Sequence, residues 1–471
     1  MESRKTTANG GNYNYSTTIR GLQLFIADLR SSQHSDDHEK RIQSEIVKIK
    51  QRFESASKKS SNGRDKLGGY QRKKYIAKLA YIYVTSNTTK LNDILFGLDQ
   101  MIELLNSDAF SEKFMAYMTL EFLYEHPIVI TKVRDQVTYH LIKDLSGKSD
   151  NNVALALNFI GVTGKLDEKM AQDENLFTEV FQILRSPTSS IYLKKKASLA
   201  FLNLLKSNPG ILTDDAQRKE LWIQRILSLL DDTQNYRLML AVLPLVEHIA
   251  KHIDPTCCIR LLPQLTQILH NCVIDGTSRS EEFPSEFKFA NVPNPWLITK
   301  ILSLLSILIV SPTEANGASS HLIQTSNMDR ETLGKLRRCV TKAIEVGTKP
   351  CNDAMERIVL NTILFSLINF ASKLDPSQEA ISNSVSALCS LLTSAEINIR
   401  YLTLDSLVKL CSISGKHAID TVRYKNLNLI FHLLDNERDS SIVRKVIDLL
   451  YTFTDSENLQ IIVEKLFDYI Q

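Results

Sequence analysis

The sequence predicts an all-α protein that folds as a superhelical solenoid of stacked helix pairs. Three observations lead to this prediction: the chain is long, glycine and proline are scarce, and a helical unit recurs. With 471 residues, the chain exceeds the roughly 250–300 residues at which a single hydrophobic core stops growing. Its 16 glycines and 12 prolines lie below the average usage of about 7% and 5%, which argues against hairpins and glycine-rich phosphate loops.

The folded part is expected to begin at residue 19, after a polar tail over residues 1–18 that we expect to be disordered. Apolar residues then recur at the i, i+3, i+4, i+7 spacing of amphipathic helices. Two such stripes facing each other predict a helical hairpin, and residues 55–69 form the first expected exposed loop. The predicted helical faces are Leu22, Phe25, Ile26 and Leu29; Ile42, Ile46, Ile49 and Phe53; Tyr75, Leu79 and Ile82; and Leu91, Ile94, Leu95, Leu98 and Ile102.

A unit of polar turn, apolar helix, second turn and second helix repeats along the rest of the chain. Asp405 and Asp448, for example, occupy matching places in two such units. A recurrence near about forty residues that contains only helices is typical of HEAT and armadillo-type repeats, whose units bury their apolar faces by stacking. Two polar stretches, residues 274–292 and 311–327, are expected to be insertions between repeats.

Composition narrows the class of protein. The net charge of +3 excludes a globally basic nucleic-acid binder but leaves room for local patches. Seven cysteines scattered through apolar segments indicate reduced thiols in the cytosol, and residues 1–18 lack the apolar stretch of a signal peptide. The most apolar run, residues 296–310, is shorter than the ~20 residues that cross a bilayer. Any membrane contact is therefore expected to be peripheral.

The motifs that could suggest catalysis or metal binding are incomplete, so we expect neither an enzyme nor a cofactor. Gly147-Lys148-Ser149 lacks the earlier glycine of a phosphate-binding loop, because Ile142 stands in that place. His248 and His252 lie on one helix face upstream of Cys257 and Cys258, but the glutamate of a zincin helix is missing. We interpret the two histidines as a helix-surface pair. No Gly-x-Ser-x-Gly elbow occurs.

Positive charge is concentrated at the amino end. Basic residues there include Lys40, Arg41, Lys48, Lys50, Lys58, Lys59, Arg64 and Lys66. For residues 40–50 alone, the ordinary interpretation is a solvated helix face. The cluster Arg72-Lys73-Lys74 is less ordinary, because three cations at the start of a helix oppose the preference of the dipole for acidic residues. It suggests a compensating anion, and an inositol phospholipid, RNA or an acidic peptide would each fit.

These segments resemble the N-terminal trunks of the alpha-adaptins, the large subunits of the plasma-membrane clathrin adaptor. The resemblance extends from about residue 19 to the end of the sequence. It is carried by residues 20–30, 39–53 and 69–75, and by the later motifs Leu155-Ala156-Leu157, Val292-Pro293-Asn294-Pro295-Trp296-Leu297, Ile399-Arg400-Tyr401-Leu402 and Ile447-Asp448-Leu449-Leu450-Tyr451.

The resemblance implies a function in clathrin-mediated endocytosis and protein transport, on the cytosolic face of the plasma membrane at coated pits. Implied partners are phosphatidylinositol 4,5-bisphosphate, small sigma, medium mu and beta-type large subunits, dileucine cargo peptides and, indirectly, clathrin. Arg30 matches a position beside the dileucine site, and Ser44 replaces a family lysine. With neighbouring basic residues included, the expected lipid-binding set is Arg20, Arg52, Arg72, Lys73, Lys74, Tyr75 and Lys78.

Residues 19–471 are thus expected to form an adaptin trunk that is incomplete at its C-terminal end, without a hinge or an appendage. Two other functions compete with the adaptor interpretation. A generic helical-repeat scaffold, similar to a transport receptor, would use the same basic end to grip an acidic peptide. RNA binding ranks last, because only Tyr70 and Tyr75 lie among the cations as surfaces for base stacking.

Overall fold

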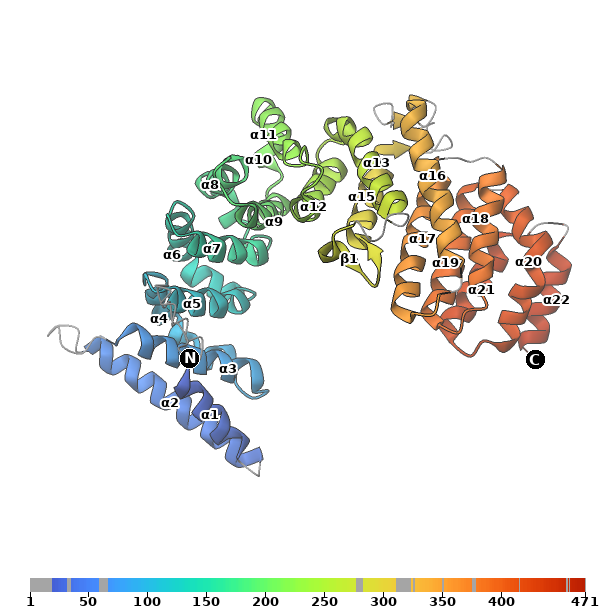
Figure 1. Cartoon of the computed structure of the whole chain (residues 1–471). Helices are drawn as coiled ribbons and strands as arrows, with labels where there is room; N and C mark the ends of the chain where they lie inside the picture. Colours follow the sequence, from blue (N-terminus) through green and yellow to red (C-terminus); the bar gives the residue numbers. More distant parts are fainter. Residues whose placement is uncertain are drawn as a thin grey trace, which may run out of the picture. The chain divides into compact units, whose positions relative to one another are not determined.

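The computed structural model describes residues 19–31, 35–58, 67–276, 283–310, 323–324, 327–349, 351–374, 378–414, 416–454, 456 and 458–470. The predicted tail at residues 1–18 lies outside this part of the chain, as do Lys59, Arg64, Lys66 and most of the predicted insertion at 311–327. The chain separates into two compact units, Met1–Asp214 and Asp215–Gln471. We call them unit 1 and unit 2, and each is a stack of helices (Figure 1).

The elements of unit 1 are α1 (Arg20–Arg30), α2 (Ser35–Lys58), α3 (Gly69–Thr85), the 3-10 turns η2 (Leu91–Asp93) and η3 (Leu95–Gly97), α4 (Leu98–Leu105), α5 (Phe110–Leu123), α6 (Pro127–Leu145), α7 (Asp150–Thr163), η4 (Met170–Gln172), α8 (Glu174–Arg185), α9 (Ile191–Ser207) and α10 (Gly210–Thr213). Its helices form two layers. Contacts run from α3 to α5, α7 and α9 in one layer and from α4 to α6 and α8 in the other.

Unit 2 contains α11 (Ala216–Ser228), α12 (Tyr236–His252), η5 (Thr256–Leu261), α13 (Leu262–His270), the π-helical turn η6 (Asn271–Asp275), η8 (Ser285–Phe287), α15 (Pro295–Leu308), α16 (Arg330–Gly347), α17 (Ala354–Leu374), α18 (Gln378–Leu391), α19 (Ile397–Ser414), α20 (Lys416–Asn436), α21 (Ser440–Thr452) and α22 (Leu459–Ile470). Two layers are present here too. One follows α12, α15, α17, α19 and α21, and α18, α20 and α22 continue the other.

The described strands of unit 2 are two residues long and lie within or at the edges of the predicted insertions. Strands β1 (Lys288–Phe289) and β2 (Val292–Pro293) pair antiparallel, with Ala290 and Asn291 at positive φ in the turn between them. Strands β3 (Ile309–Val310) and β4 (Ile323–Gln324) pair in parallel. The described part of the first insertion is therefore a short hairpin set beside a π-helical turn.

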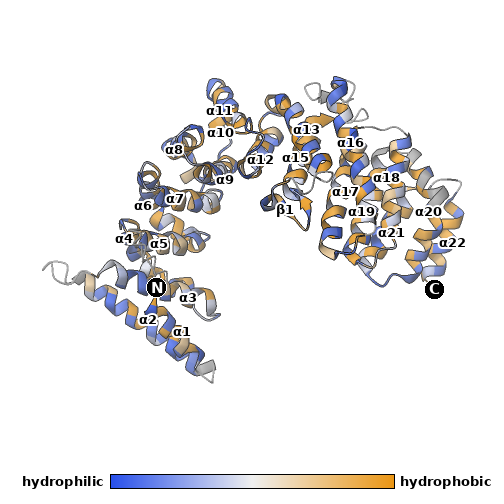
Figure 2. Ribbon diagram, viewed as in Figure 1, coloured by the Kyte–Doolittle hydropathy of each residue, from blue (hydrophilic) through white to orange (hydrophobic). Residues whose placement is uncertain are grey.

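The solenoid of helix pairs confirms the predicted fold class, and the apolar stripes explain how it is held together. Phe25, Leu29, Ile42 and Ile49 are buried, as the helical period required. Figure 2 shows the hydrophobic residues as stripes along the helices rather than as whole hydrophobic segments. Side-chain caps fix several helix starts: Asp173, Asp215, Asn235, Asp329 and Asp439 each accept hydrogen bonds from backbone amides of the first turn.

Two boundaries differ from the predicted ones. Helix α2 continues to Lys58, so the first loop begins later than residue 55. The predicted helix over residues 91–102 is two 3-10 turns followed by α4. Lys90 and Asp93 cap the first turn, and Gly97 passes so close to α3 that an added Cβ would lie 3.0 Å from Leu79 Cδ1. The tighter turns follow from this local capping and close packing.

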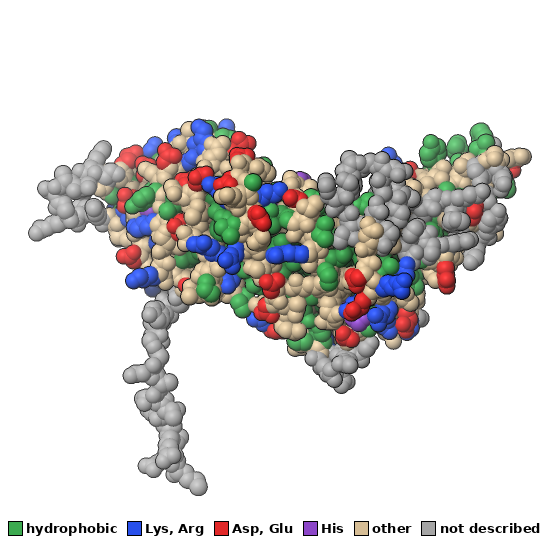
Figure 3. Space-filling view, turned by 90° about the horizontal axis from the view of Figure 1, so that it is seen from above, with side chains coloured by type: hydrophobic (Ala, Val, Ile, Leu, Met, Phe, Trp, Pro, Cys, Tyr) green, Lys and Arg blue, Asp and Glu red, His purple; other side chains and the backbone are tan. Residues whose placement is uncertain are grey.

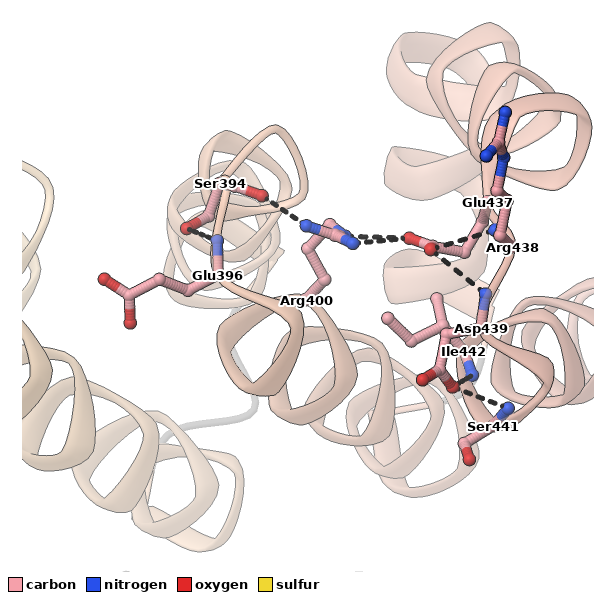
Figure 4. A network of polar contacts seen from close by, with 8 residues as sticks. All are labelled: Ser394, Glu396, Arg400, Glu437, Arg438, Asp439, Ser441 and Ile442. Carbon is pink, nitrogen blue, oxygen red and sulfur yellow. Dashed lines mark hydrogen bonds and ion pairs between the residues drawn. The ribbon is translucent and has the colours of Figure 1, made fainter.

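Polar contacts join neighbouring repeats at nearly constant sequence separations. In unit 1, Tyr83 Oη lies 2.7 Å from His126 Nε2, and Tyr124 Oη donates to Asp167 Oδ2 at 3.0 Å, each pair 43 residues apart. In unit 2, Arg400 lies 2.7 Å from Glu437, 37 residues later, and also donates to the Ser394 carbonyl (Figure 4). Both units therefore contain polar contacts between residues about one repeat apart, as expected for a stacked array.

Helix α17 is the one described helix that is long and apolar enough to cross a membrane by length and composition. Its side chains point to a different role. Residues Leu364, Leu367, Ile368 and Phe370 are almost completely buried, and the helix packs against α15, α16 and α19. Burial on several sides is what a core helix of a stacked array requires.

Candidate basic surface at the amino-terminal helices

The first three helices place the predicted basic residues around the start of α3. Helix α3 begins at Gly69 after Gly68, which has no side chain to cap the helix, and no acidic residue lies in its first turn. Helix α1 also begins without an acidic first turn, and its first residue, Arg20, is exposed. Among the described residues, Arg20 pairs with no carboxylate. The local charge at both helix starts is therefore positive.

The three consecutive cations of α3 contact three different helices. Arg72 Nε donates to Gln100 Oε1 of α4 at 2.8 Å, and Lys73 Nζ donates to Ser111 Oγ of α5 at 3.2 Å. Lys74 instead crosses α1, where a Cβ added to Gly21 would lie 2.5 Å from Lys74 Cδ. Successive residues of an α-helix point about 100° apart, so three in a row do not share one face.

The lysines of α3 also differ in how far they are buried and paired. Lys73 is only 5% exposed, and its ammonium lies 5.7 Å from the centroid of the Tyr70 ring. Lys78 is paired with Glu45 of α2 at 2.5 Å and lies 4.9 Å from the centroid of the Phe25 ring. Both cations are satisfied inside unit 1. Of the expected lipid-binding lysines, Lys74 is the one that reaches α1 beside Arg20.

Tyr75 of the expected set lies next to this corner, and Arg52 adjoins Phe53, which packs on Tyr75. Tyr75 is half-buried and packs edge to face on Phe53, with ring centroids 5.9 Å apart. The Lys74 ammonium lies over the Tyr75 ring, 4.7 Å from its centroid. Arg52, which precedes Phe53 on α2, is exposed and forms no ion pair with the described residues. We call Arg20, Arg52 and Lys74, with Arg72 at the edge, the amino-terminal basic surface.

An internal carboxylate already occupies part of the start of α3. A Cβ on Gly69 would lie 2.1 Å from Glu112 Oε2, so the Glu112 side chain of α5 reaches directly to the first residue of α3. Ser107 Oγ donates to the same oxygen at 2.6 Å. A carboxylate at a helix N-terminus is stabilising. Sequence reasoning missed this residue because it follows Gly69 by a full repeat and carries no local signal.

Arg30 lies at the other end of α1. Ten residues separate it from Arg20, which is about 15 Å along a helix, so the two arginines do not form one site. Arg30 is exposed and makes no ion pair with the described residues. Asp28 near it is engaged by Arg41 of α2 at 2.8 Å. The basic residues of α1 therefore provide two separate positions.

Charge elsewhere is mixed. On the face shown in Figure 3, Lys and Arg side chains alternate with Asp and Glu instead of forming one continuous field.

Gly147, Lys148 and Ser149 form the predicted loop between α6 and α7. The rings of His248 and His252 lie side by side on α12 in a tilted arrangement, with centroids 4.7 Å apart. Within the described ranges, no group of three or more His, Cys, Asp and Glu side chains is placed to hold a metal ion.

The family model and the similar proteins point to the same family for this chain. The family described as "Adaptin N terminal region" matches residues 38–471. The chain is 69% identical over 472 residues to the AP-2 complex subunit alpha of Saccharomyces cerevisiae, across 100% of this chain and 46% of that protein. It is 29% identical over 464 residues to the AP-2 complex subunit alpha-2 of Dictyostelium discoideum, across 97% of this chain and 41% of that protein. The chain thus spans less than half the length of these relatives.

A structural match covers 84% of this chain and 57% of a chain in a homology model of the full-length AP-3 complex in an intermediate open conformation, with a TM-score of 0.49 and 19% identity.

Proposed function

The chain belongs to the adaptin family, and from this premise we propose that it forms the trunk of a clathrin-adaptor large subunit in clathrin-mediated endocytosis. The observation that carries the proposal is the 69% identity, across the whole chain, to a protein named as an AP-2 alpha subunit. The chain would act with small sigma, medium mu and beta-type large subunits. It would work on the cytosolic face of the plasma membrane at coated pits.

Uncovered apolar side chains support the proposal of partner chains. Phe114 and Met118 of α5 are 43% and 39% exposed, and Leu199 of α9 is 44% exposed. They lie in one layer of unit 1, because α5, α7 and α9 contact one another in turn. Apolar side chains repeated along one layer mark a surface for protein contacts rather than scattered exposure.

The amino-terminal basic surface is proposed to bind phosphatidylinositol 4,5-bisphosphate. Arg20, Arg52 and Lys74 combine exposure or partial exposure with the lack of a carboxylate partner in the described structure, and Lys74 passes close to α1 at Gly21. Each basic residue near an anionic surface contributes about 1 kcal/mol, so these few cations give weak and reversible binding. Stable recruitment would then depend on further sites in the assembled complex.

Binding of the chain to liposomes with and without the phosphoinositide tests this role. Neutralising two cations in R20Q/K74Q removes about 2 kcal/mol and should weaken binding about 30-fold. The matched control is R438Q/R444Q, which neutralises two exposed arginines of unit 2. Unchanged affinity in the first variant, or equal binding to both kinds of liposome, contradicts the lipid site. Competition by an acidic peptide but not by inositol phosphates would favour the scaffold alternative.

Arg30 is proposed to contribute to a dileucine cargo site formed with the small sigma subunit. Its exposure, its lack of an ion pair in the described residues and its distance from Arg20 leave it available for a second anionic ligand. R30E in the chain co-expressed with a sigma subunit should lose retention of an acidic dileucine peptide and keep liposome binding. Loss of both activities, or of neither, counts against two separate sites.

A further inference from the structure

Unit 2 contains a cavity of about 410 Å³ between α11 and η5. Its polar lining comprises Lys219, Glu220, Gln224, Asp254, Cys257 and Arg260. A volume of this size falls within the roughly 300–1,000 Å³ of small-molecule sites. The cavity therefore combines room for a small ligand with a thiol, two cationic side chains and two carboxylates.

The thiol of Cys257 is one of a neighbouring pair with opposite environments. Cys257 is half-buried and lines the cavity, whereas Cys258 is 0% exposed. Their Sγ atoms lie 3.7 Å apart, and Cys257 Sγ also donates to the Asp254 carbonyl at 2.9 Å. Only the first thiol of the pair is thus accessible to a ligand in the cavity.

Charged groups of both signs surround this thiol, two cations and two carboxylates. Lys219 Nζ lies 2.9 Å from Asp254 Oδ2, and Arg260 Nη2 donates to the Gln224 carbonyl at 3.3 Å. Glu220 accepts a hydrogen bond from Gln224 and is the second carboxylate of the lining. The hydrogen bond from Cys258 lowers the pKa of Cys257, and the charge of Lys219 acts in the same direction, against burial and Asp254.

The other cysteines show the contrast. Burial raises the pKa of each of Cys272, Cys339, Cys389 and Cys411 to about 12. The hydrogen bond to Cys257, together with burial, raises the pKa of Cys258. Because the thiolate is the nucleophile in disulfide exchange, these five thiols are poor reactants. Cys351, which lies just before α17, is half-buried like Cys257. It is therefore the cysteine with which the reactivity of Cys257 is compared.

We propose that Cys257 is a modification site that forms a mixed disulfide with a small anionic peptide thiol of the glutathione type, seated in this cavity against Lys219 and Arg260. This proposal does not depend on the adaptor function. The carboxylates of such a peptide match the two cations, and its ammonium group matches Glu220. The neighbouring cysteine would not displace it, because Cys258 is buried and stays protonated.

The reaction is an ordinary thiol–disulfide exchange. The Cys257 thiolate attacks one sulfur of the small disulfide, a new S–S bond forms, and the old S–S bond breaks. The leaving thiolate takes up a proton equivalent to the one that Cys257 has lost. Cys257 is oxidised and one sulfur of the small disulfide is reduced, so no other oxidant is required.

Intact-mass measurement and peptide mapping of the chain after incubation with glutathione disulfide test the proposal. We expect Cys257 to react faster than Cys351 at neutral pH, because Cys257 lines a cavity whose cations can seat the incoming peptide and because the hydrogen bond from Cys258 lowers its pKa. C257S should lose the fast adduct and C351S should keep it, whereas K219Q should slow its formation.

Mapping on the unaltered chain decides the question even if C257S does not fold. An equal or faster adduct at Cys351, or an unmodified Cys257, overturns the proposal. Loss of both Cys257 and Cys258 thiols without added mass also overturns it, since that result means a disulfide within the pair. A rate in K219Q equal to that of the unaltered chain removes the role of the cation in the cavity.

Discussion

Lys113 Nζ lies 2.6 Å from Asp144 Oδ1, and both side chains are almost completely buried between α5 and α6. Tyr117 Oη donates to the other carboxylate oxygen at 2.8 Å, and the Leu105 carbonyl accepts a second hydrogen bond from Lys113. Burial, followed by the charge of Asp144 and the hydrogen bond to it, raises the pKa of Tyr117, so this tyrosine remains a neutral donor. A charged pair thus sits within the core of unit 1 with its hydrogen-bonding groups satisfied.

We expect K113M to destabilise unit 1 by about 3–5 kcal/mol, because it leaves the Asp144 carboxylate buried and uncompensated. Hydrogen exchange of peptides from α5 and α6 measures the loss locally. Tryptophan fluorescence would instead report on unit 2, because Trp222 and Trp296 both lie there. The double variant K113M/D144L should recover most of the protection, since it removes the charge together with its partner. A loss smaller than about 1 kcal/mol in K113M would mean that water reaches the pair.

His140 makes the stability of unit 1 depend on pH. Burial, and then the nearby charge of Lys113, lowers the pKa of His140 below its ordinary value of 6.5. Its Nδ1 atom is buried without a partner among the described residues. The unfolded chain therefore binds this proton first as the pH falls, so the contribution is complete above about pH 6.5 and is lost below it.

Urea unfolding at about pH 7.5 and about pH 5.5 should show this loss in the unaltered chain and a smaller loss in H140L. H252Q, which changes an exposed histidine of α12, is the control and should keep the full pH dependence. If H140L retains the same pH dependence as the unaltered chain, another group causes it.

Removing the Glu112 carboxylate should strengthen anion binding at the start of α3. In E112Q the negative charge beside Gly69 is lost, and a dipole term of about 0.5–1 kcal/mol predicts about two- to fivefold tighter binding to phosphoinositide liposomes. The control is E331Q, which neutralises an exposed glutamate in the first turn of α16. Weaker binding in E112Q would indicate that Glu112 positions the amino-terminal basic surface instead of competing for it.

The ion pair between Arg400 and Glu437 should contribute more to stability than the equivalent pair one repeat earlier. The side chains of Arg400 and Glu437 are 14% and 10% exposed, whereas those of Arg357 and Glu396 are 41% and 31% exposed. R400M should cost about 2 kcal/mol and R357M less than about 1 kcal/mol, because solvent screens the second pair. Hydrogen exchange at the start of α21 and α19, respectively, distinguishes the two losses.

Placing a lysine at Ser44, where the resemblance implies one, should add to lipid binding. Ser44 is exposed on α2, the helix that also carries Arg52. One further cation near an anionic surface contributes about 1 kcal/mol, so S44K should bind phosphoinositide liposomes about fivefold more tightly. S441K on α21 supplies the same charge at an exposed serine of unit 2 and serves as the control. An equal gain in both variants would indicate attraction by net charge alone.

The helical elements could be predicted because their signal is local. The stripe of Phe25 and Leu29, for example, repeats every third or fourth residue, and burial follows from it. The surroundings of the cations could not be predicted in this way. That Arg72, Lys73 and Lys74 diverge follows from helix geometry, but the helix that each one meets depends on packing across a full repeat.

The same limit explains the features that sequence reasoning missed. Glu112 reaches Gly69 from another helix pair, and Lys219 reaches the Cys257 cavity from α11. The sequence did bring the two neighbouring cysteines forward, but in connection with His248 and His252. In the structure, the partners of Cys257 are Asp254 and Lys219 instead.

Contacts that span about one repeat make each unit compliant. The pairs Tyr124–Asp167 and Arg400–Glu437 join only adjacent repeats, and α17, α19 and α21 contact one another in sequence. A force applied to the end of such a stack is shared among many small interfaces in series. Each interface needs to yield only slightly, so bending within a unit is distributed over the interfaces between repeats, and the helices themselves stay intact.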